Sequence, residues 1–168
     1  THGVSLSKEV SQWLDETATV LSLARKHLGN GPISEALRYT ILAGLGQAAS
    51  GYRQTLYQQE FFSGTVAHGF NEIGVMLDDA LAAIDHSIQT NLGDDGLYQA
   101  YNLIELQEKS VAVDHLYPML EGQVAALSSG VIAPAQAIDV LDALFNSSLF
   151  REDQNTFILY PDRKLPGF

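Results

Sequence analysis

Apolar residues recur at every third or fourth position along several long segments of this chain, and this spacing constrains the fold more than any other feature. Residues 6–28 show it most clearly, with an apolar stripe of Leu6, Val10, Trp13, Leu14, Thr17, Leu21, Ala24 and Leu28. A stripe with this period lies on one face of an α-helix, and it is stable in water only when another element covers it. The chain is therefore expected to consist mainly of helices packed through their apolar faces.

Capping and turn residues mark the ends of these segments. Ser7 precedes a helical pattern, where its side-chain oxygen can accept a hydrogen bond from the first helical N–H groups. A second helix is expected to start at Ser34, with Glu35 in its first turn, where the helix dipole favours an acid. Glycine-containing turns close helices at residues 29–32, 63–64, 93–96 and 129–130. Pro134 suits a helix start, because an N–H at that position would have no helical partner. Together these signals predict six helices, at about residues 6–28, 34–62, 65–91, 97–109, 113–128 and 133–147.

The second of these segments is unusually apolar. Between residues 36 and 49, the clearly polar residues are Arg38, Thr40 and Gln47. Such a helix is expected at the centre of a fold, packed on several sides. Its small residues let neighbouring helices approach closely, although each glycine costs a helix about 1 kcal/mol relative to alanine. Either packing compensates for this cost, or the helix breaks near residues 50–51.

The last eighteen residues, 151–168, follow a different pattern. Their two prolines, Pro161 and Pro166, exclude a continuous helix, and Leu165 and Phe168 leave the end of the chain apolar. We therefore predict an all-α fold, a bundle of about six helices in antiparallel hairpins. It comprises a helical domain over residues 1–150 and an extended C-terminal arm over residues 151–168, which is expected to be truncated and to continue in a longer parent protein.

Composition excludes several classes of function. The 168 residues include 9 Lys and Arg against 20 Asp and Glu, a net charge of −11, and no cysteine. Disulfides and thiolate metal sites are therefore excluded. An acidic chain without a basic stripe is not expected to bind nucleic acid. No apolar run approaches the roughly 20 residues of a membrane span, so no membrane partner is expected. Composition does not identify a compartment, although a cytoplasmic location is favoured over secretion.

One set of residues has the types that bind metals. His68, Glu72, Asp79 and His86 fall on a single stripe if residues 65–91 form one helix. That stripe lies opposite the apolar face of the same helix, so a solvated polar face explains it better than a metal site. The Asp94–Gly96 stretch lacks the oxygen ligands of a calcium loop and is interpreted as a turn. No metal and no cofactor are therefore expected.

Catalytic signatures are equally weak. The chain has no cysteine nucleophile and no Gly-x-Ser-x-Gly turn. Pairs of carboxylates suited to glycoside hydrolysis are available among Glu105, Glu108, Asp114 and Glu121. Their separations cannot be determined from the sequence, so the catalytic residues stay unknown.

Two clusters are candidate ligand-binding sites. The first is Tyr98, Tyr101 and Asn102, which place aromatic rings beside an amide after an acidic turn, as in many sugar-binding surfaces. Core packing and helix capping are the alternative explanation for it. The second comprises Arg151, Asp153, Gln154, Asp162 and Arg163, in a tail that is otherwise apolar. Ion pairs that anchor the arm are the alternative explanation for this second cluster.

Three stretches carry a resemblance to known proteins. They are DGLYQAYNLI at 95–104, MLEGQVAALSSG at 119–130, and REDQNTFILYPDRKLPGF at 151–168. Together they resemble the C-terminal part of a family of very large bacterial proteins described as cellobiose-phosphorylase-like or glycoside-hydrolase-like. The resemblance implies that the chain is a segment of a multidomain carbohydrate-active protein. It carries over no catalytic residue, because no catalytic motif of that family falls within these stretches.

We therefore expect a helical module of a larger carbohydrate-active protein, and not a complete enzyme by itself. Its expected partners are the remainder of that polypeptide and a carbohydrate. The alternative is a self-contained helical domain that binds proteins, and a homodimer formed through the arm would favour it. A complete small hydrolase that uses Glu and Asp, with Tyr98 and Tyr101 at a sugar site, is the third possibility.

Overall fold

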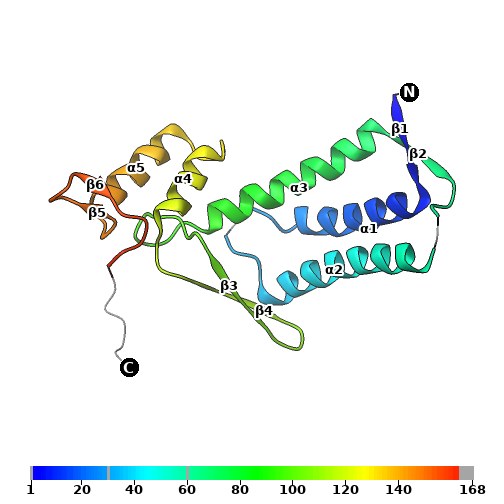
Figure 1. Cartoon of the computed structure of the whole chain (residues 1–168), viewed down its shortest axis with the longest axis horizontal. Helices are drawn as coiled ribbons and strands as arrows, with labels where there is room; N and C mark the ends of the chain where they lie inside the picture. The colour runs from blue at the N-terminus through cyan, green and yellow to red at the C-terminus, as the bar shows by residue number, and fades with distance from the viewer. Residues whose placement is uncertain (1, 30, 60, 163–168) are drawn as a thin grey trace. The chain divides into compact units, whose positions relative to one another are not determined.

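The computed structural model describes the chain except residues 1, 30, 60 and 163–168. Within the described residues it contains five helices and six short strands (Figure 1). In chain order these are β1 (Gly3–Ser7), α1 (Lys8–Arg25), α2 (Glu35–Gln58), β2 (Thr65–Gly69), α3 (Phe70–Thr90), β3 (Asn102–Leu106), β4 (Val111–His115), α4 (Leu120–Ser128), α5 (Pro134–Phe145), β5 (Phe150–Arg151) and β6 (Thr156–Phe157). The strands pair as three two-stranded sheets. The fold is thus mixed α and β, and the prediction of an all-α bundle of six helices is wrong.

The chain forms two compact units. Unit 1 comprises Thr1–His86 and Leu106–Val111, and unit 2 comprises Ser87–Glu105 and Ala112–Phe168. The β3–β4 hairpin is shared between them, since its tip belongs to unit 1 and its remainder to unit 2. Residues 151–162, expected to form an arm, belong to unit 2.

In unit 1, α1 and α2 lie side by side and run in opposite directions (Figure 1). Ser7 caps α1 as predicted, with its Oγ 3.4 Å from the N–H nitrogen of Val10. The second helix starts after Ser34 as expected, and Ser34 caps it, with its Oγ 3.3 Å from the N–H nitrogen of Leu37. A Cβ placed on Gly44 would lie only 2.8 Å from Val20 Cγ2, so a glycine is needed where the two helices meet. The expectation that small residues let helices approach closely is confirmed at this position.

The predicted central position of α2 is wrong. Only Ala48 is buried among its described side chains, and the Tyr57 side chain near its C-terminal end is 87% exposed. Alanine and glycine make the segment apolar in composition, but they add little side-chain volume, and the contact with α1 covers one face. The helix does not break near residues 50–51 and continues without interruption to Gln58.

The helix predicted over residues 65–91 begins five residues later. Residues 65–69 form β2, which pairs antiparallel with β1 so that Val4 lies opposite His68 and Leu6 opposite Val66. The two strands are separated by about sixty residues of sequence, including two helices. Local periodicity cannot reveal a partner at that distance, and a run of five residues is short enough to fit either pattern.

The helix predicted over residues 97–109, and the first part of the helix predicted over 113–128, are also wrong. Within these segments, residues 102–115 form the β3–β4 hairpin, in which the Gln107 N–H donates to the Ser110 carbonyl across the turn. Val111 and Val113 favour a strand, and Pro118 restricts the preceding residue to extended backbone. The helix in this region, α4, therefore begins only at Leu120.

Unit 2 is built around two small apolar clusters. Leu97, Leu144 and Leu149 form one, and Tyr98, Ala126 and Val140 form the other. Beside the first, Phe145 packs edge to face with Phe150 and with Phe157, and the rings of Phe150 and Phe157 are tilted relative to each other. The three pairs of ring centroids are 5.0–5.2 Å apart. Pro134 occupies the first turn of α5 as predicted. The expected apolar chain end at Leu165 and Phe168 lies outside the described residues, and truncation stays a prediction.

Candidate functional site

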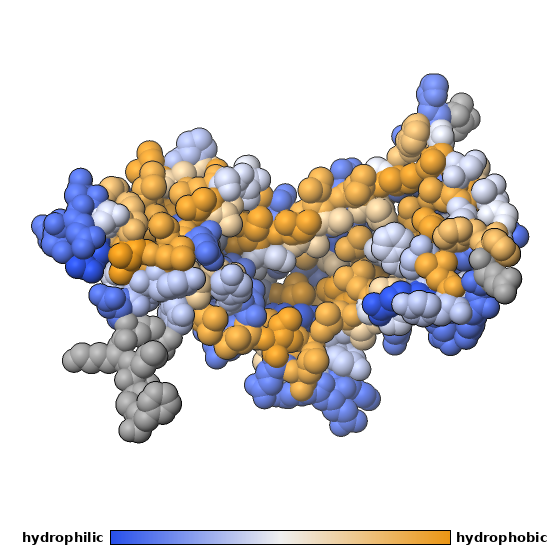
Figure 2. All heavy atoms as spheres, viewed as in Figure 1, coloured by the Kyte–Doolittle hydropathy of each residue, from blue (hydrophilic) through white to orange (hydrophobic). Residues whose placement is uncertain are grey.

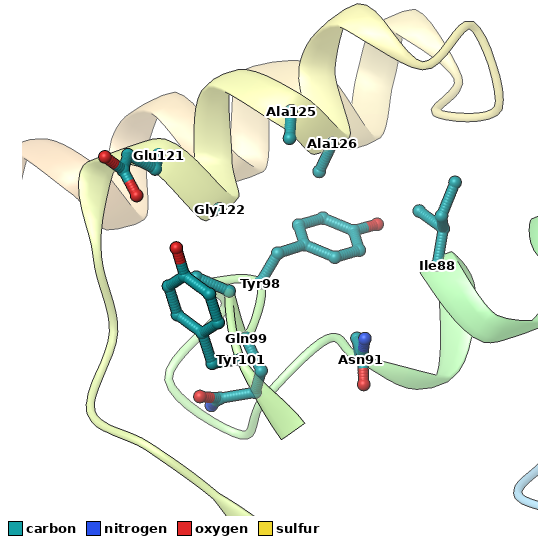
Figure 3. Close-up of a pocket in the computed structure, with 10 residues that line it drawn as sticks. Ile88, Asn91, Tyr98, Gln99, Tyr101, Glu121, Gly122, Ala125 and Ala126 are labelled. Carbon is teal, nitrogen blue, oxygen red and sulfur yellow. The ribbon is translucent and has the colours of Figure 1, made fainter. Parts of the chain in front are cut away.

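A cavity of about 320 Å³ opens within unit 2 (Figure 3). Three segments form it: the end of α3, the loop before β3, and the first turns of α4. Its lining residues are Ile88, Asn91, Tyr98, Gln99, Ala100, Tyr101, Glu121, Gly122, Ala125 and Ala126. The volume lies at the lower end of the range for small-molecule sites, and an apolar lining with a few polar groups is typical of them.

The turn at residues 93–96 directs the chain into this cavity. The N–H of Gly93 donates to the carbonyl of Leu97 at 2.8 Å, and Gly96 has a φ of 76°, a conformation that glycine adopts without strain. Leu92 and Tyr98 then pair as an isolated antiparallel bridge. The acidic turn predicted here is therefore present, and it is followed by extended chain instead of a helix.

A buried glutamine on α4 binds the backbone of the loop that lines the cavity. The Gln123 side chain is completely buried, and its Nε2 donates to the Tyr98 carbonyl while its Oε1 accepts from the Tyr98 N–H, both at 2.7 Å. Gly122 permits this close approach, because a Cβ there would lie 3.0 Å from the Tyr98 carbonyl oxygen and from Ala100 Cβ. The loop before β3 and helix α4 are thus held together through the backbone N–H and carbonyl of Tyr98.

The two predicted tyrosines have different environments. Tyr98 is 2% exposed and its hydroxyl accepts a hydrogen bond from Gln136 Nε2 at 2.9 Å. Burial raises the pKa of Tyr98, while the bond from Gln136 acts in the opposite direction. Tyr101 is 53% exposed, and its ring stands beside that of Tyr98 with its hydroxyl directed toward the start of α4 (Figure 3). Core packing therefore accounts for Tyr98, and an open aromatic face is present at Tyr101.

Glu121 and Gln99 line the same cavity as the open ring of Tyr101. Glu121 is exposed in the first turn of α4, where the helix dipole favours a negative charge. Gln99 Oε1 is buried and accepts no hydrogen bond from any described residue. An unsatisfied buried acceptor is costly, so this oxygen favours a ligand or water that donates to it.

Asn102 does not line the cavity, but it binds Asn91, a residue that does. Its Nδ2 donates to Asn91 Oδ1 at 3.1 Å, and its Oδ1 lies 2.8 Å from His115 Nδ1. The structure thus brings the three predicted residues Tyr98, Tyr101 and Asn102 to one place, with a different role for each. Sequence reasoning missed Asn91 and Gln99, which follow no motif, and it offered Glu121 only as one carboxylate among several.

The second predicted cluster is a set of exposed ion pairs. Both carboxylate oxygens of Asp153 accept hydrogen bonds from the Arg151 guanidinium at 2.9 Å, and Asp162 lies 3.9 Å from it. This arrangement lowers the pKa of Asp153 and raises that of Arg151. Gln154 lies in the turn, with its N–H bonded to the Arg151 carbonyl. Arg163 lies outside the described residues.

The carboxylates considered for glycoside hydrolysis are not gathered at the cavity. Of Glu105, Glu108, Asp114 and Glu121, only Glu121 lines it. Asp114 accepts a hydrogen bond from the backbone N–H of His115, and Glu108 lies in the hairpin tip. The cavity therefore has one of the two carboxylates that glycoside hydrolysis ordinarily requires.

The predicted polar stripe at His68 and Glu72 is wrong, because the two residues lie on different elements. His68, on β2, is buried, and its Nε2 lies 2.7 Å from Ser11 Oγ on α1. Its Nδ1 lies 3.4 Å from Glu72 Oε2 on α3. The order serine, histidine, carboxylate matches that of hydrolytic triads, but the Ser11 side chain belongs to a residue only 5% exposed and does not line the cavity. We therefore interpret these contacts as a structural connection between three elements of unit 1.

No group of three or more histidine, aspartate or glutamate side chains is placed to bind a metal ion in the residues that the structure describes. None of the described helices combines the length and apolar character needed to cross a membrane.

In comparisons with known proteins, no protein-family description and no curated protein matches the chain.

Proposed function

We propose that unit 2 binds a carbohydrate in the cavity at Tyr101, and that the chain is a mixed α and β module of a larger carbohydrate-active protein. One observation carries the proposal. An open aromatic face, a carboxylate and an unsatisfied amide oxygen, from Tyr101, Glu121 and Gln99, line a single cavity. The resemblance of residues 95–104 and 119–130 to carbohydrate-active proteins falls on the two segments that form most of this cavity.

The chemistry of a sugar fits these three groups. A pyranose ring has an apolar C–H face that can lie against an aromatic ring, and hydroxyl groups at its edge. A carboxylate such as that of Glu121 accepts hydroxyl hydrogen bonds that are stronger than neutral ones. The side chain of Gln99 also lines the cavity. Ala125 and Ala126 add apolar surface to the lining of the cavity.

Binding is favoured over hydrolysis by the single carboxylate at the cavity. A retaining or inverting glycosidase needs two carboxyl groups, at roughly 5 Å or 6.5–9.5 Å from each other. The proposed role is therefore to hold a glycan for a larger protein.

The mass of the native polypeptide tests the proposal that the chain is a module of a larger protein. Intact mass spectrometry of the protein from its source cells should give a mass far above 18.3 kDa, and a product of 18.3 kDa would contradict it.

Titration by nuclear magnetic resonance tests the binding itself. We expect saturable shifts of the amide signals of Tyr101, Glu121 and Gly122 when cellobiose is added to the full chain, with a Kd in the millimolar range. The variant Tyr101→Ala should lose these shifts. Tyr57→Ala removes a tyrosine that is still more exposed, in unit 1, and should bind as the unmodified chain does. Equal shifts in both variants, or no saturation with any mono- or disaccharide, would contradict the proposal.

A further inference from the structure

The helix α3 has an apolar stripe that no other described element of unit 1 covers. Four side chains form this stripe, and each is between 51% and 56% exposed: Phe70, Leu77, Leu81 and Ile84. No residue of α3 is buried, although α3 is strongly amphipathic. Figure 2 shows hydrophobic residues along much of its length. Apolar residues scattered over a surface need no explanation, but a continuous stripe along one helix indicates an interaction surface.

The spacing of the stripe indicates the kind of partner. Phe70, Leu77 and Ile84 are seven residues apart, and Leu81 lies one turn after Leu77. Side chains repeated at this interval remain on one side of a helix over three heptads, which is the arrangement by which one helix packs along another. A second helix laid along α3 would contact all four side chains.

The charge beside the stripe indicates the partner's composition. Asp78 and Asp85 directly follow Leu77 and Ile84, so both carboxylates lie along the same edge of the stripe. α3 contains four acidic residues, Glu72, Asp78, Asp79 and Asp85, and no lysine or arginine. No ion pair joins Asp78 or Asp85 to a basic side chain of the described residues. Lysine or arginine beside the apolar residues of a partner would complement this edge.

We propose that α3 is a docking surface for a basic amphipathic helix of another polypeptide, whose apolar residues cover the stripe and whose basic residues pair with Asp78 and Asp85. A second copy of this chain is the less favourable occupant. Its net charge is −11, and its own α3 would place further carboxylates beside those already present. This proposal concerns unit 1 and is independent of sugar binding in unit 2.

A defined peptide tests the proposal. The probe is a fluorescent helical peptide of 21 residues, the length of α3, with leucine at heptad positions a and d and lysine at the flanking positions. The lysines keep the peptide from associating with itself. We expect saturable binding to the full chain with a micromolar Kd, measured by fluorescence anisotropy. A peptide with glutamate in place of every lysine should bind at least about ten times more weakly.

Matched variants identify the surface. Leu81→Asp places a charge in the stripe and should weaken binding of the lysine peptide at least about tenfold. Val75→Asp makes the same change on the other side of α3, where Val75 is also exposed, and should leave the Kd unchanged. The double variant D78N/D85N should weaken binding several-fold and reduce its dependence on salt.

Three results would overturn the proposal. One is equal loss of binding in Leu81→Asp and Val75→Asp, and another is equal affinity for the lysine and glutamate peptides. The third is a dimer of the chain alone, seen by sedimentation velocity and abolished by Leu81→Asp but not by Val75→Asp. That result would make a second copy the occupant of the stripe.

Discussion

Gln123 binds both backbone polar groups of Tyr98 with one side-chain amide. Its Nε2 donates to the carbonyl and its Oε1 accepts from the N–H, each at 2.7 Å, and Nε2 also donates to the Met119 carbonyl at 3.0 Å. The amide thereby makes the two backbone hydrogen bonds that a neighbouring β-strand would otherwise make, at a point where the loop meets α4. Both groups of Tyr98 are buried, so the connection between loop and α4 depends on this one side chain.

Replacement of this glutamine should destabilise the protein. Gln123→Leu preserves most of the volume but leaves the Tyr98 N–H and carbonyl without partners, at a cost of about 3 kcal/mol in the free energy of unfolding. Urea denaturation followed by circular dichroism measures this change. Gln54→Leu, at an exposed position of α2, should change the free energy of unfolding by less than about 0.5 kcal/mol. A loss at Gln123 no larger than at Gln54 would contradict the assigned role.

Replacement by alanine should change the stability of the protein in opposite directions at two glycines of α2, Gly44 and Gly46. Gly44→Ala places a methyl 2.8 Å from Val20 Cγ2, and overpacking of this kind typically costs about 1–3 kcal/mol. Gly46 has no neighbouring atom within 4 Å, so Gly46→Ala should stabilise α2 by about 0.5–1 kcal/mol through helix propensity alone. Thermal unfolding of the two variants checks the sign of each change. The close approach of α1 and α2 would be contradicted if both variants were stabilised.

Stability should fall in acid because of Glu9. Hydrogen bonds from the Ser63 hydroxyl, and then from its N–H, lower the pKa of Glu9 from 4.5 to about 2. Since the folded pKa lies below the unfolded one, Glu9 contributes its full stability above pH 4.5 and loses it as the pH falls toward 2. Melting temperatures between these pH values should therefore fall less steeply in Glu9→Gln than in the unmodified chain.

Exposed Glu16 serves as the control for this experiment. Glu16→Gln should keep the acid dependence of the unmodified chain, because its carboxylate has a single exposed hydrogen bond, from Gln12. If Glu9→Gln and Glu16→Gln showed the same slope, the contact with Ser63 would not be the source of the acid sensitivity.

Loss of the Ser11 hydroxyl should also weaken unit 1. Ser11→Ala leaves the buried His68 Nε2 without its partner at 2.7 Å and should lower the free energy of unfolding by about 1–2 kcal/mol. Ser22→Ala, in the same helix, is expected to have little effect. A fluorophosphonate probe should not label the unmodified chain at Ser11, because that residue is almost fully buried. Covalent labelling at Ser11 would contradict the structural interpretation and indicate a reactive serine.

Helix positions could be predicted largely from the sequence by itself. α1, α2 and α5 begin where Ser7, Ser34 and Pro134 indicated, and the apolar face expected for α3 is present. These features depend on residues within one or two turns of one another, because a helix satisfies its own backbone hydrogen bonds locally. The strands did not follow from the sequence, since β1 and β2 find partners about sixty residues apart.

The candidate site shows the same division. The sequence placed Tyr98 and Tyr101 in one cluster, but these residues of the same type, three positions apart, are 2% and 53% exposed. Both α4 and α5 distinguish them, because Gln123 and Gln136 bind the backbone and the hydroxyl of Tyr98. The ring of Tyr101 is left open beside Glu121 and Gly122. Local sequence thus determined where α1, α2 and α5 start. Tertiary structure alone decided which side chains are buried and which line a cavity, because burial depends on neighbours that are distant along the chain.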